Sequence, residues 1–215
     1  MHSFFRLPRI YPLTDVQLSG LSHAGQVHLL GQAGATLVQL RDKQMPALEF
    51  YLHAKAAVAV AARSGVRLII NDRADVALAA AAHGVHLGQD DMPPEAARRI
   101  LGEEAIIGYS THNVGQAQRA ATLPINYIAI GPIFKSSTKS DTSPTLGLQG
   151  LQSVRQAVGN VQLVAIGGIS HANARAVIEA GADSVAVISA LLFEPDHITD
   201  ATRTLIHSLP PVWST

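Results

Sequence analysis

The chain has 215 residues, with 16 basic and 16 acidic side chains, a formal net charge of zero and no cysteine. The charge balance excludes the broad basic surface that binds nucleic acids or anionic membranes, and the lack of thiols excludes disulfides, a cysteine nucleophile and thiolate metal ligands. Because the length suits one core and no signal peptide or membrane-spanning run is recognisable, we expect residues 1–215 to form a single, soluble, cytoplasmic domain.

Short runs rich in Val, Ile and Leu recur along the chain, and nearly every run ends in glycine or in a polar or charged cluster. Parallel strands buried on both faces give such continuous apolar runs, and their loops carry the chemistry at the carboxyl ends. A doubly wound open sheet satisfies much of this pattern, but it gathers polar residues at one switch point. The count of eight therefore favours a single (β/α)8 TIM barrel, with strands at 9–13, 36–40, 67–70, 85–87, 105–108, 127–130, 162–166 and 184–188.

The segments between these runs have helical spacing, as in Leu48, Leu52, Ala56 and Ala59, which recur at intervals of three and four residues. Serine and proline indicate several helix starts, at Ser22, at Pro93-Pro94 and at Ser170. Glycine can close a helix in the left-handed conformation without a Cβ penalty. The predicted helix ends are Gly34, Gly65, Gly84, Gly102, Gly159 and Gly181.

Two aspartates, Asp72 and Asp91, follow the third and fourth runs directly or within a short turn. The carboxyl ends of neighbouring barrel strands lie side by side, so these carboxylates should converge. Such hard oxygen ligands suit Mg²⁺, which often takes one or two carboxylates together with substrate phosphates and water. Helix capping by the same residues is the alternative, and spacing alone does not separate Asp90 from Asp91.

A basic cluster is predicted at the same face of the barrel. Gln39, Arg41 and Lys43 alternate at the end of the second run, so their side chains share one side of the extended backbone, and Lys139 follows the sixth run. Arginine presents a planar fork to phosphate oxygens and lysine presents a point charge. Opposite a metal held by aspartates, these cations indicate a polyphosphate site, although a merely solvated strand end is also compatible.

Glycines follow the seventh run, at Gly167-Gly168, and the small residue Ser189 opens a helix after the eighth. In these barrels such a pair of loops commonly binds phosphate through backbone N–H groups and a helix N-terminus, although two glycines can also make a plain turn. The long segment 131–147 is rich in Ser, Thr and Lys, which is typical of a substrate-covering loop or a disordered excursion.

Several other signals are missing or weak. There is no Ser/His/Asp order, Walker loop or dinucleotide fingerprint, so the sequence gives no support to a hydrolase, a nucleotidase or a dehydrogenase. His83 and His86 flank Gly84 and do not share a helical face. We therefore interpret them as structural or solvated side chains and not as metal ligands.

Six motifs, in order along residues 10–189, resemble the thiamin-phosphate synthase family. Each motif is modest alone, but together they are specific. They are Tyr11-Pro12-Leu13-Thr14-Asp15, Gln39-Leu40-Arg41-Asp42-Lys43, Asn71-Asp72-Arg73, the stretch from Gly84 to Asp91, Gly131-Pro132-Ile133-Phe134 with Thr138-Lys139, and Ala165-Ile166-Gly167-Gly168-Ile169.

The resemblance implies an enzyme that joins 4-amino-2-methyl-5-(diphosphooxymethyl)pyrimidine to 4-methyl-5-(2-phosphooxyethyl)thiazole, giving thiamin phosphate and pyrophosphate. It implies Mg²⁺ bound by Asp72 and Asp91, which favours Asp91 over Asp90. Arg41, Ser110 and Lys139 would be catalytic. The pyrimidine diphosphate would be bound by Gln39, Leu40, Arg41, Asp42, Lys43, Asn71, Ser110 and Lys139, and the thiazole phosphate by Ser136, Ser137, Thr138, Gly168, Ile188 and Ser189.

The family reaction is dissociative, which fits the absence of an evident base or covalent nucleophile. Two alternatives remain: a metal-free thiazole tautomerase of the same superfamily, and a non-catalytic sensor of phosphate ligands on the same scaffold. Retention of Lys43, Asp72, Asp91 and Lys139 argues against the tautomerase, which has no diphosphate substrate. The expected partners are the two small molecules, without nucleic acid or membrane, and a homo-oligomer is compatible with the sequence.

Overall fold

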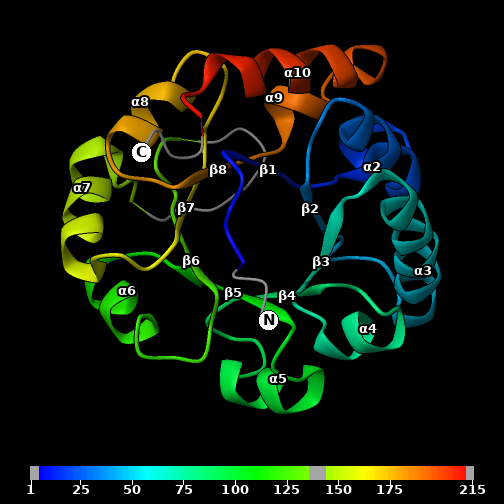
Figure 1. Ribbon diagram of the computed structural model, residues 1–215, viewed down its shortest axis with the longest axis horizontal. Helices are drawn as coiled ribbons and strands as arrows, with labels where there is room; N and C mark the ends of the chain where they lie inside the picture. The colour runs from blue at the N-terminus through cyan, green and yellow to red at the C-terminus, as the bar shows by residue number, and fades with distance from the viewer. Residues whose placement is uncertain (1–4, 136–143, 212–215) are drawn as a thin grey trace.

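The computed structural model describes residues 5–135 and 144–211, and their strands form a ring enclosed by helices (Figure 1). All eight strands predicted from the apolar runs are present. Each strand end lies within one residue of its predicted position, except that β5 extends three residues further at its carboxyl end. Their bounds are β1 Ile10–Pro12, β2 Leu37–Leu40, β3 Arg67–Asn71, β4 Gly84–Leu87, β5 Ile106–Thr111, β6 Tyr127–Ile130, β7 Leu163–Ile166 and β8 Ser184–Val187.

Every strand pair is parallel, and the sheet runs in the order β1-β8-β7-β6-β5-β4-β3-β2. The two outer members of this order meet through a parallel bridge between Leu13 and Gln39, where Thr14 N donates to Gln39 O at 2.9 Å. The sheet therefore closes on itself. The prediction of a TIM barrel is confirmed, and the doubly wound open sheet is excluded.

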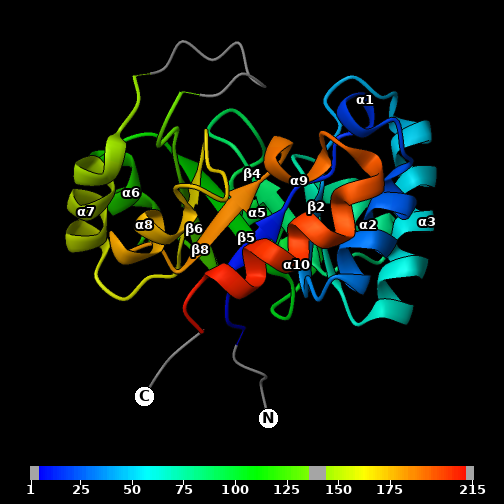
Figure 2. The same cartoon turned by 90° about the horizontal axis from the view of Figure 1, so that it is seen from above.

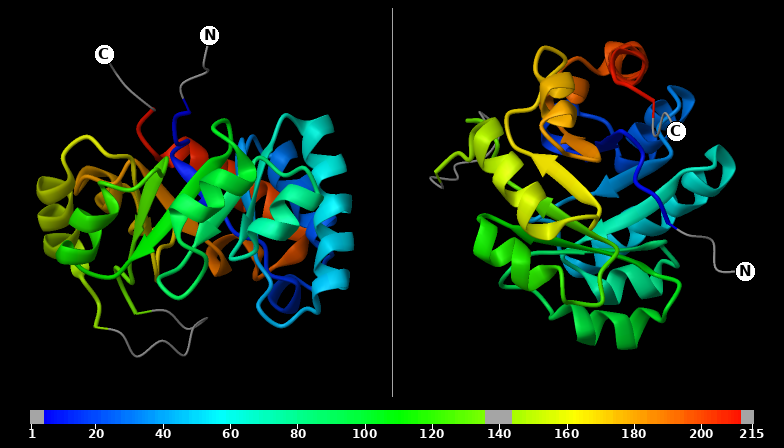
Figure 3. Two further views of the ribbon diagram at one scale, coloured as in Figure 1. Left: turned by 90° about the horizontal axis from the view of Figure 1, so that it is seen from below. Right: turned by 60° about the vertical axis from the view of Figure 1, so that its left-hand side comes forward.

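Helices follow the strands and lie outside the ring, as two further views show (Figure 3). Ser22 starts α2 as predicted, since its hydroxyl accepts from Gly25 N at 3.2 Å. The helices are α1 Val16–Ser19, α2 His23–Gln32, α3 Ala47–Ser64, α4 Ala74–Ala79, α5 Pro94–Leu101, α6 Val114–Ala120, α7 Gly147–Val158, α8 Ala174–Glu179, α9 Ser189–Leu192 and α10 Ile198–Ser208, with a 3₁₀ turn η1 at Pro195–His197.

Two apolar cores hold the layers together. The larger lies between the strands and the helices, with buried side chains such as Leu68 and Ile70 of β3 facing Ala54 and Ala57 of α3. The smaller fills the barrel interior from alternate strand positions. Because successive strand residues point to opposite faces, each short apolar run supplies both cores. The interior core consists of Leu7, Tyr11, Leu13, Leu37, Ile69, Ile106, Tyr127, Ala129, Val164 and Ala186.

The prediction that glycine ends six helices is wrong at Gly84, which is the first residue of β4. A Cβ at this position would lie 2.8 Å from the backbone nitrogen of Ile106 and closer still to that residue's carbonyl group. Gly84 is therefore required by the close approach of β4 to β5 and not by a helix end. The other five glycines adopt positive φ angles as expected.

The strands point toward the end of the barrel at which α1 lies, as the view from above shows (Figure 2). At the opposite end the first and last described segments meet, where the Arg9 guanidinium donates to the carbonyls of Pro210 and Pro211 at 3.0 and 2.9 Å. The two described termini therefore lie away from the loops at the carboxyl ends of the strands, where a site is expected. Within the described residues, no helix is long and apolar enough to cross a membrane.

Candidate active site

A cavity of about 1180 Å³ opens at the carboxyl ends of the strands. Ten residues predicted to bind substrate or metal line this cavity. They are Gln39, Arg41, Lys43, Asn71, Asp72, Asp91, Ser110, Gly168, Ile188 and Ser189. Four further predicted residues, Ser136, Ser137, Thr138 and Lys139, lie outside the described residues, as do residues 136–143 of the segment predicted to cover the substrates.

From Gln39 in β2 to Lys43, successive side chains point alternately into the cavity and away from it. Gln39, Arg41 and Lys43 line the cavity, whereas Leu40 is buried away from it. The Asp42 carboxylate turns back into its own loop, where Oδ1 accepts from the backbone N–H groups of Gln44 and Met45, both at 2.9 Å. Any contact of Leu40 or Asp42 with substrate would therefore come from the backbone, and their predicted role stays a prediction.

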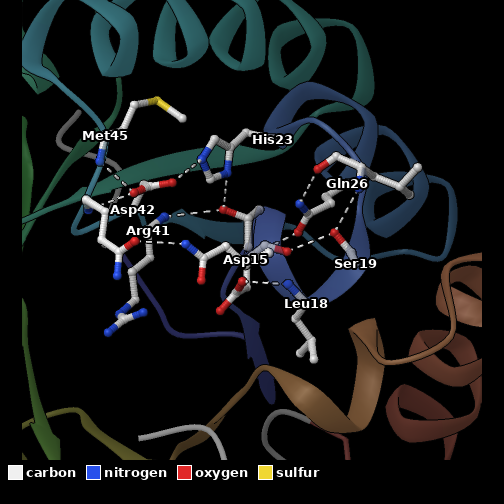
Figure 4. A network of polar contacts seen from close by, with 12 residues as sticks. Asp15, Leu18, Ser19, His23, Gln26, Arg41, Asp42 and Met45 are labelled. Atoms are coloured by element: carbon white, nitrogen blue, oxygen red, sulfur yellow. Dashed lines mark hydrogen bonds and ion pairs between the residues drawn. The ribbon is translucent and has the colours of Figure 1, made fainter.

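A polar network around Thr14 and His23 holds the backbone of the loop that follows β2 (Figure 4). The Thr14 hydroxyl lies 2.7 Å from Nδ1 of His23 and accepts from Arg41 N at 3.3 Å. Burial, followed by the charge of His53, lowers the pKa of His23 to about 4, so its imidazole is neutral near pH 7. The side chain of Arg41 extends away from the network. The network thus fixes the backbone from which Arg41 reaches the cavity.

Asp72 and Asp91 meet at the rim, as the sequence predicts. Asp72 adopts φ 63°, an unusual left-handed conformation that costs on the order of 1 kcal/mol and directs its carboxylate toward the cavity. Burial raises the pKa of Asp72, Lys43 opposes this rise from 3.4 Å, and the hydrogen bond and charge of Asp91 add to it. A second carboxylate and a cation therefore contact Asp72 together.

The donor set fits Mg²⁺. Asp91 Oδ2 accepts from Gly88 N at 2.6 Å, which fixes the turn that carries this carboxylate. No group of three or more His, Cys, Asp and Glu side chains able to hold a metal occurs among residues 5–135 and 144–211. A pair of carboxylates, completed by substrate phosphates and water, is a common arrangement for Mg²⁺. Helix capping is wrong as an alternative, since α4 and α5 follow Arg73 and Pro93 without a side-chain cap.

Asn71 carries an unused buried donor beside these carboxylates. It is 6% exposed, it lines the cavity, and its amide nitrogen Nδ2 has no hydrogen-bond partner within the part of the chain that the structure describes. Buried amide groups are nearly always hydrogen-bonded, so an unsatisfied one facing a cavity indicates a ligand contact. This fits the predicted contact of Asn71 with the pyrimidine diphosphate.

The opposite side of the cavity is built from backbone. Gly167 and Gly168, after β7, have φ angles of 104° and 62°. A Cβ on Gly168 would lie 2.8 Å from Cβ of Phe134 and closer still to Lys135 O, so the loops after β6 and β7 touch there through their main chains. Ser189 starts the short helix α9 at the same rim. The loops after β7 and β8 are the pair predicted to bind phosphate, and only glycine fits the contact that Gly168 makes with the loop after β6.

Two residues that line the cavity, Tyr11 and His86, were missed as functional candidates, and so was Tyr127, whose buried hydroxyl contacts both of them. His86 is buried, lines the cavity and is hydrogen-bonded on both ring nitrogens, so the structural interpretation and not the solvated one holds for it. The structural interpretation also holds for His83, whose Nδ1 accepts from Leu68 N at 3.1 Å. The available signal was alternation, because His86 is a polar residue between Val85 and Leu87 and must face the barrel interior.

Comparison with known proteins gives one consistent family. The family model described as Thiamine monophosphate synthase matches residues 10–191. A protein of Koribacter versatilis named thiamine-phosphate synthase is 44% identical, covering 97% of this chain and 100% of its own, and one of Albidiferax ferrireducens with the same name is 47% identical, covering 91% and 89%. The solved thiamine phosphate pyrophosphorylase of Pyrococcus furiosus superposes with a TM-score of 0.84 at 34% identity, covering 93% and 94%.

Proposed function

The chain belongs to the thiamine monophosphate synthase family, and we propose that its cavity joins a pyrimidine diphosphate to a thiazole phosphate to give thiamin phosphate and pyrophosphate. Its activity is that of a transferase, as in the relatives named thiamine-phosphate synthase. The observation that carries the substrate assignment is that one cavity presents charged side chains on one side and a glycine-built backbone surface on the other. Two phosphorylated substrates would require these two kinds of surface.

The charged side is assigned to the pyrimidine diphosphate. Arg41 and Lys43 supply cations there, Gln39 and Asn71 supply amides, and Ser110 supplies a hydroxyl. Lys139, after β6, is assigned to the same diphosphate. The backbone side, with Gly168, Ile188 and Ser189, is assigned to the thiazole phosphate together with Ser136, Ser137 and Thr138. The contact of Lys43 with Asp72 at 3.4 Å supports the first assignment, because diphosphate and metal would then be adjacent.

Asp72 and Asp91 are assigned to Mg²⁺. When bound, the metal would neutralise charge that develops on the departing pyrophosphate. The two carboxylates would position it beside Lys43, so that the fixed cations and the metal contact the same leaving group. Their convergence is the support for this assignment.

The proposed chemistry is dissociative. The bond between the pyrimidine methylene carbon and the diphosphate oxygen breaks, and its electron pair leaves with pyrophosphate. The remaining pyrimidine cation is captured by the lone pair of the thiazole nitrogen, which forms the new C–N bond. The chain's residues therefore stabilise charge and exclude water. At an effective dielectric constant near 20, a unit charge pair at about 4 Å is worth roughly 4 kcal/mol before desolvation.

A direct assay tests the proposal. Purified protein is mixed with both substrates and Mg²⁺, and released pyrophosphate and thiamin phosphate are measured. We expect the two products to form in equal amounts. A tautomerase would isomerise a thiazole carboxylate without Mg²⁺ or pyrophosphate release, and a sensor would bind both substrates without turnover. The relatives at 44% and 47% identity, both named as synthases, favour neither alternative.

We also propose that the protein acts in the cytoplasm on small molecules, without nucleic acid, and that it can form a homo-oligomer. Small phosphorylated substrates and the balanced net charge support the first part. Cell fractionation and light scattering of the purified protein would test the location and the oligomeric state.

A further inference from the structure

A continuous chain of hydrogen bonds crosses the barrel interior from β2 to β5, two strands well separated around the ring (Figure 1). Gln39 Nε2 donates to Oη of Tyr11 at 3.0 Å, and the hydroxyls of Tyr11 and Tyr127 are 2.9 Å apart. Oη of Tyr127 then lies 3.0 Å from His86 Nδ1, and His86 Nε2 lies 2.8 Å from Oγ of Ser110. Both terminal residues line the cavity on the side assigned to the diphosphate.

Packing fixes the three rings of this chain. Tyr11 and Tyr127 are fully buried and meet edge to face with centroids 5.8 Å apart, while the imidazole of His86 stacks on Tyr127 at 5.5 Å. Gly108 pairs with Tyr127 across the sheet, and a side chain on Gly108 would overlap the Tyr127 ring. Since the rings cannot swing to other partners, the hydrogen-bond order within the chain is decided by donors and acceptors alone.

The amide of Gln39 sets the direction at one end. Its Nε2 can only donate, so Oη of Tyr11 accepts there. Burial raises the pKa of both tyrosines above the usual range, so each phenol keeps its one proton. Within the described residues, the only acceptor left for the proton of Tyr11 is Oη of Tyr127. Tyr127 consequently donates its own proton onward, to His86.

The hydrogen-bond order continues from Tyr127 to the cavity. Nδ1 of His86 accepts from Tyr127, so a neutral imidazole carries its proton on Nε2 and donates it to Oγ of Ser110. Since Oγ already accepts from His86, the hydroxyl proton of Ser110 is directed elsewhere. The cavity that Ser110 lines is the direction left for it.

We propose that Tyr11, Tyr127 and His86 are positioning residues that hold Ser110 as a hydrogen-bond donor toward the departing diphosphate. The reverse order fails at its far end, because Tyr11 would then accept from both Gln39 and Tyr127 and its own buried proton would have no acceptor among the described residues. An unsatisfied buried hydroxyl is strongly disfavoured, so the chain has one stable order.

This inference rests on the proposed function, because it needs an anion for Ser110 to contact. Such a donor matters most when negative charge grows on the leaving oxygen, so the order of the chain should affect the chemical step more than substrate binding. The order itself is a property of the ligand-free protein. It can therefore be measured apart from any activity.

The first experiment measures the tautomer of His86 by nitrogen NMR on protein labelled with ¹⁵N-histidine. The His86 signals are assigned by their loss in His86→Gln. We expect the wild-type imidazole near pH 7 to carry hydrogen on Nε2 and none on Nδ1. A dominant Nδ1–H tautomer, or a doubly protonated ring, would overturn the proposal without the need for any other variant.

The second experiment compares kinetics. Tyr127→Phe removes the donor to Nδ1, so we expect the Nδ1–H tautomer to appear and kcat to fall about tenfold, with the KM for pyrimidine diphosphate within about twofold. Tyr51→Phe, the same change on the outer helix α3, is the matched control and should leave kcat and the His86 signals unchanged. A wild-type kcat in Tyr127→Phe would overturn the proposal.

A double variant separates positioning from a structural role. In the Ser110→Ala background, Tyr127→Phe should cause no further loss of kcat, because the chain acts only through the Ser110 hydroxyl. Additive losses would assign Tyr127 to the fold and refute the proposal. If the wild-type protein releases no pyrophosphate at all, the proposed function fails, whereas the NMR result still decides the order of the chain.

Discussion

The two sides of the cavity differ in the part of the polypeptide that faces the substrates. From β2 to β5 the lining is made of long or polar side chains, including Arg41, Lys43 and Asp72. From β6 to β8 it consists largely of apolar side chains such as Phe134 and Ile188 together with the glycine turn at Gly167 and Gly168. The first side is therefore tuned by charge and hydrogen-bond direction, and the second by backbone conformation and close packing.

This difference predicts different consequences of mutation. A neutral substitution on the side-chain side removes a charge yet leaves the loop intact, so it should slow the chemical step. A substitution on the glycine side adds atoms where two loops touch, so it should weaken binding of the thiazole phosphate. A variant on one side that produced the pattern expected for the other side would contradict this difference.

The largest effect is expected for Asp72→Asn, which keeps the shape of the side chain and removes the negative charge that pairs with Lys43. We expect the rate of pyrophosphate release in a single turnover to fall more than about 100-fold, since losing roughly 3 kcal/mol of transition-state stabilisation has this effect. The control is Asp90→Asn, the acidic neighbour of Asp91, with an expected change below about threefold. A stronger loss in the control would transfer the metal role to Asp90.

A loss of similar size, again about 100-fold or more, is expected for Lys139→Ala, because its cation is assigned to the leaving group. Circular dichroism should show an unchanged fold. Lys135→Ala changes the other lysine of the segment 131–147, serves as the comparison and should be much milder. Near-normal single-turnover rates in Lys139→Ala would remove this residue from the catalytic set.

A smaller effect is expected for Gly168→Ala. The added Cβ would press on Phe134 and on Lys135 O, which displaces the loops that face the thiazole phosphate. We expect the KM for the thiazole phosphate to rise about tenfold while the KM for the pyrimidine diphosphate stays within about twofold. Gly65→Ala has a similar φ, 66°, with open space around the new Cβ, and should leave both constants unchanged.

The smallest effect is expected for His23, which belongs to the polar network that fixes the backbone of Arg41. The pKa of His23 is lowered to about 4 in the fold, below its unfolded value, so the folded state binds fewer protons and stability falls with acidification. Between pH 7 and 5.5 we expect His23 to account for a loss of about 1 kcal/mol in unfolding free energy. Urea denaturation of His23→Gln should show a weaker pH dependence, and His28→Gln, at an exposed position on the same helix, should match wild type. Identical slopes for all three proteins would contradict this role.

The sequence by itself determined the barrel and most of the rim. Apolar runs, polar strand ends and positive-φ glycines are local signals, because backbone pairing and turn chemistry depend on neighbouring residues. Alternation placed Gln39, Arg41 and Lys43 on one side, and the strand order placed Asp72 near Asp91. Local spacing was misleading at Gly84, which makes room for Ile106 of the neighbouring strand. It was also misleading in α3, where Leu48 and Leu52 are exposed and Phe50, Ala54, Ala57 and Ala61 form the buried face, and at Ser170, because α8 begins only after Asn173.

Tertiary structure alone decided the contacts inside the ring. Tyr11 and Tyr127 are 116 positions apart, and their hydroxyls meet only because the closed barrel brings β1 and β6 together across its interior. The left-handed backbone of Asp72 likewise depends on a partner fixed by the fold, since Asp72 N donates to His86 O at 2.8 Å. A hydrogen bond has a direction and a length, and the sequence carries neither until the strands set the distance between donor and acceptor.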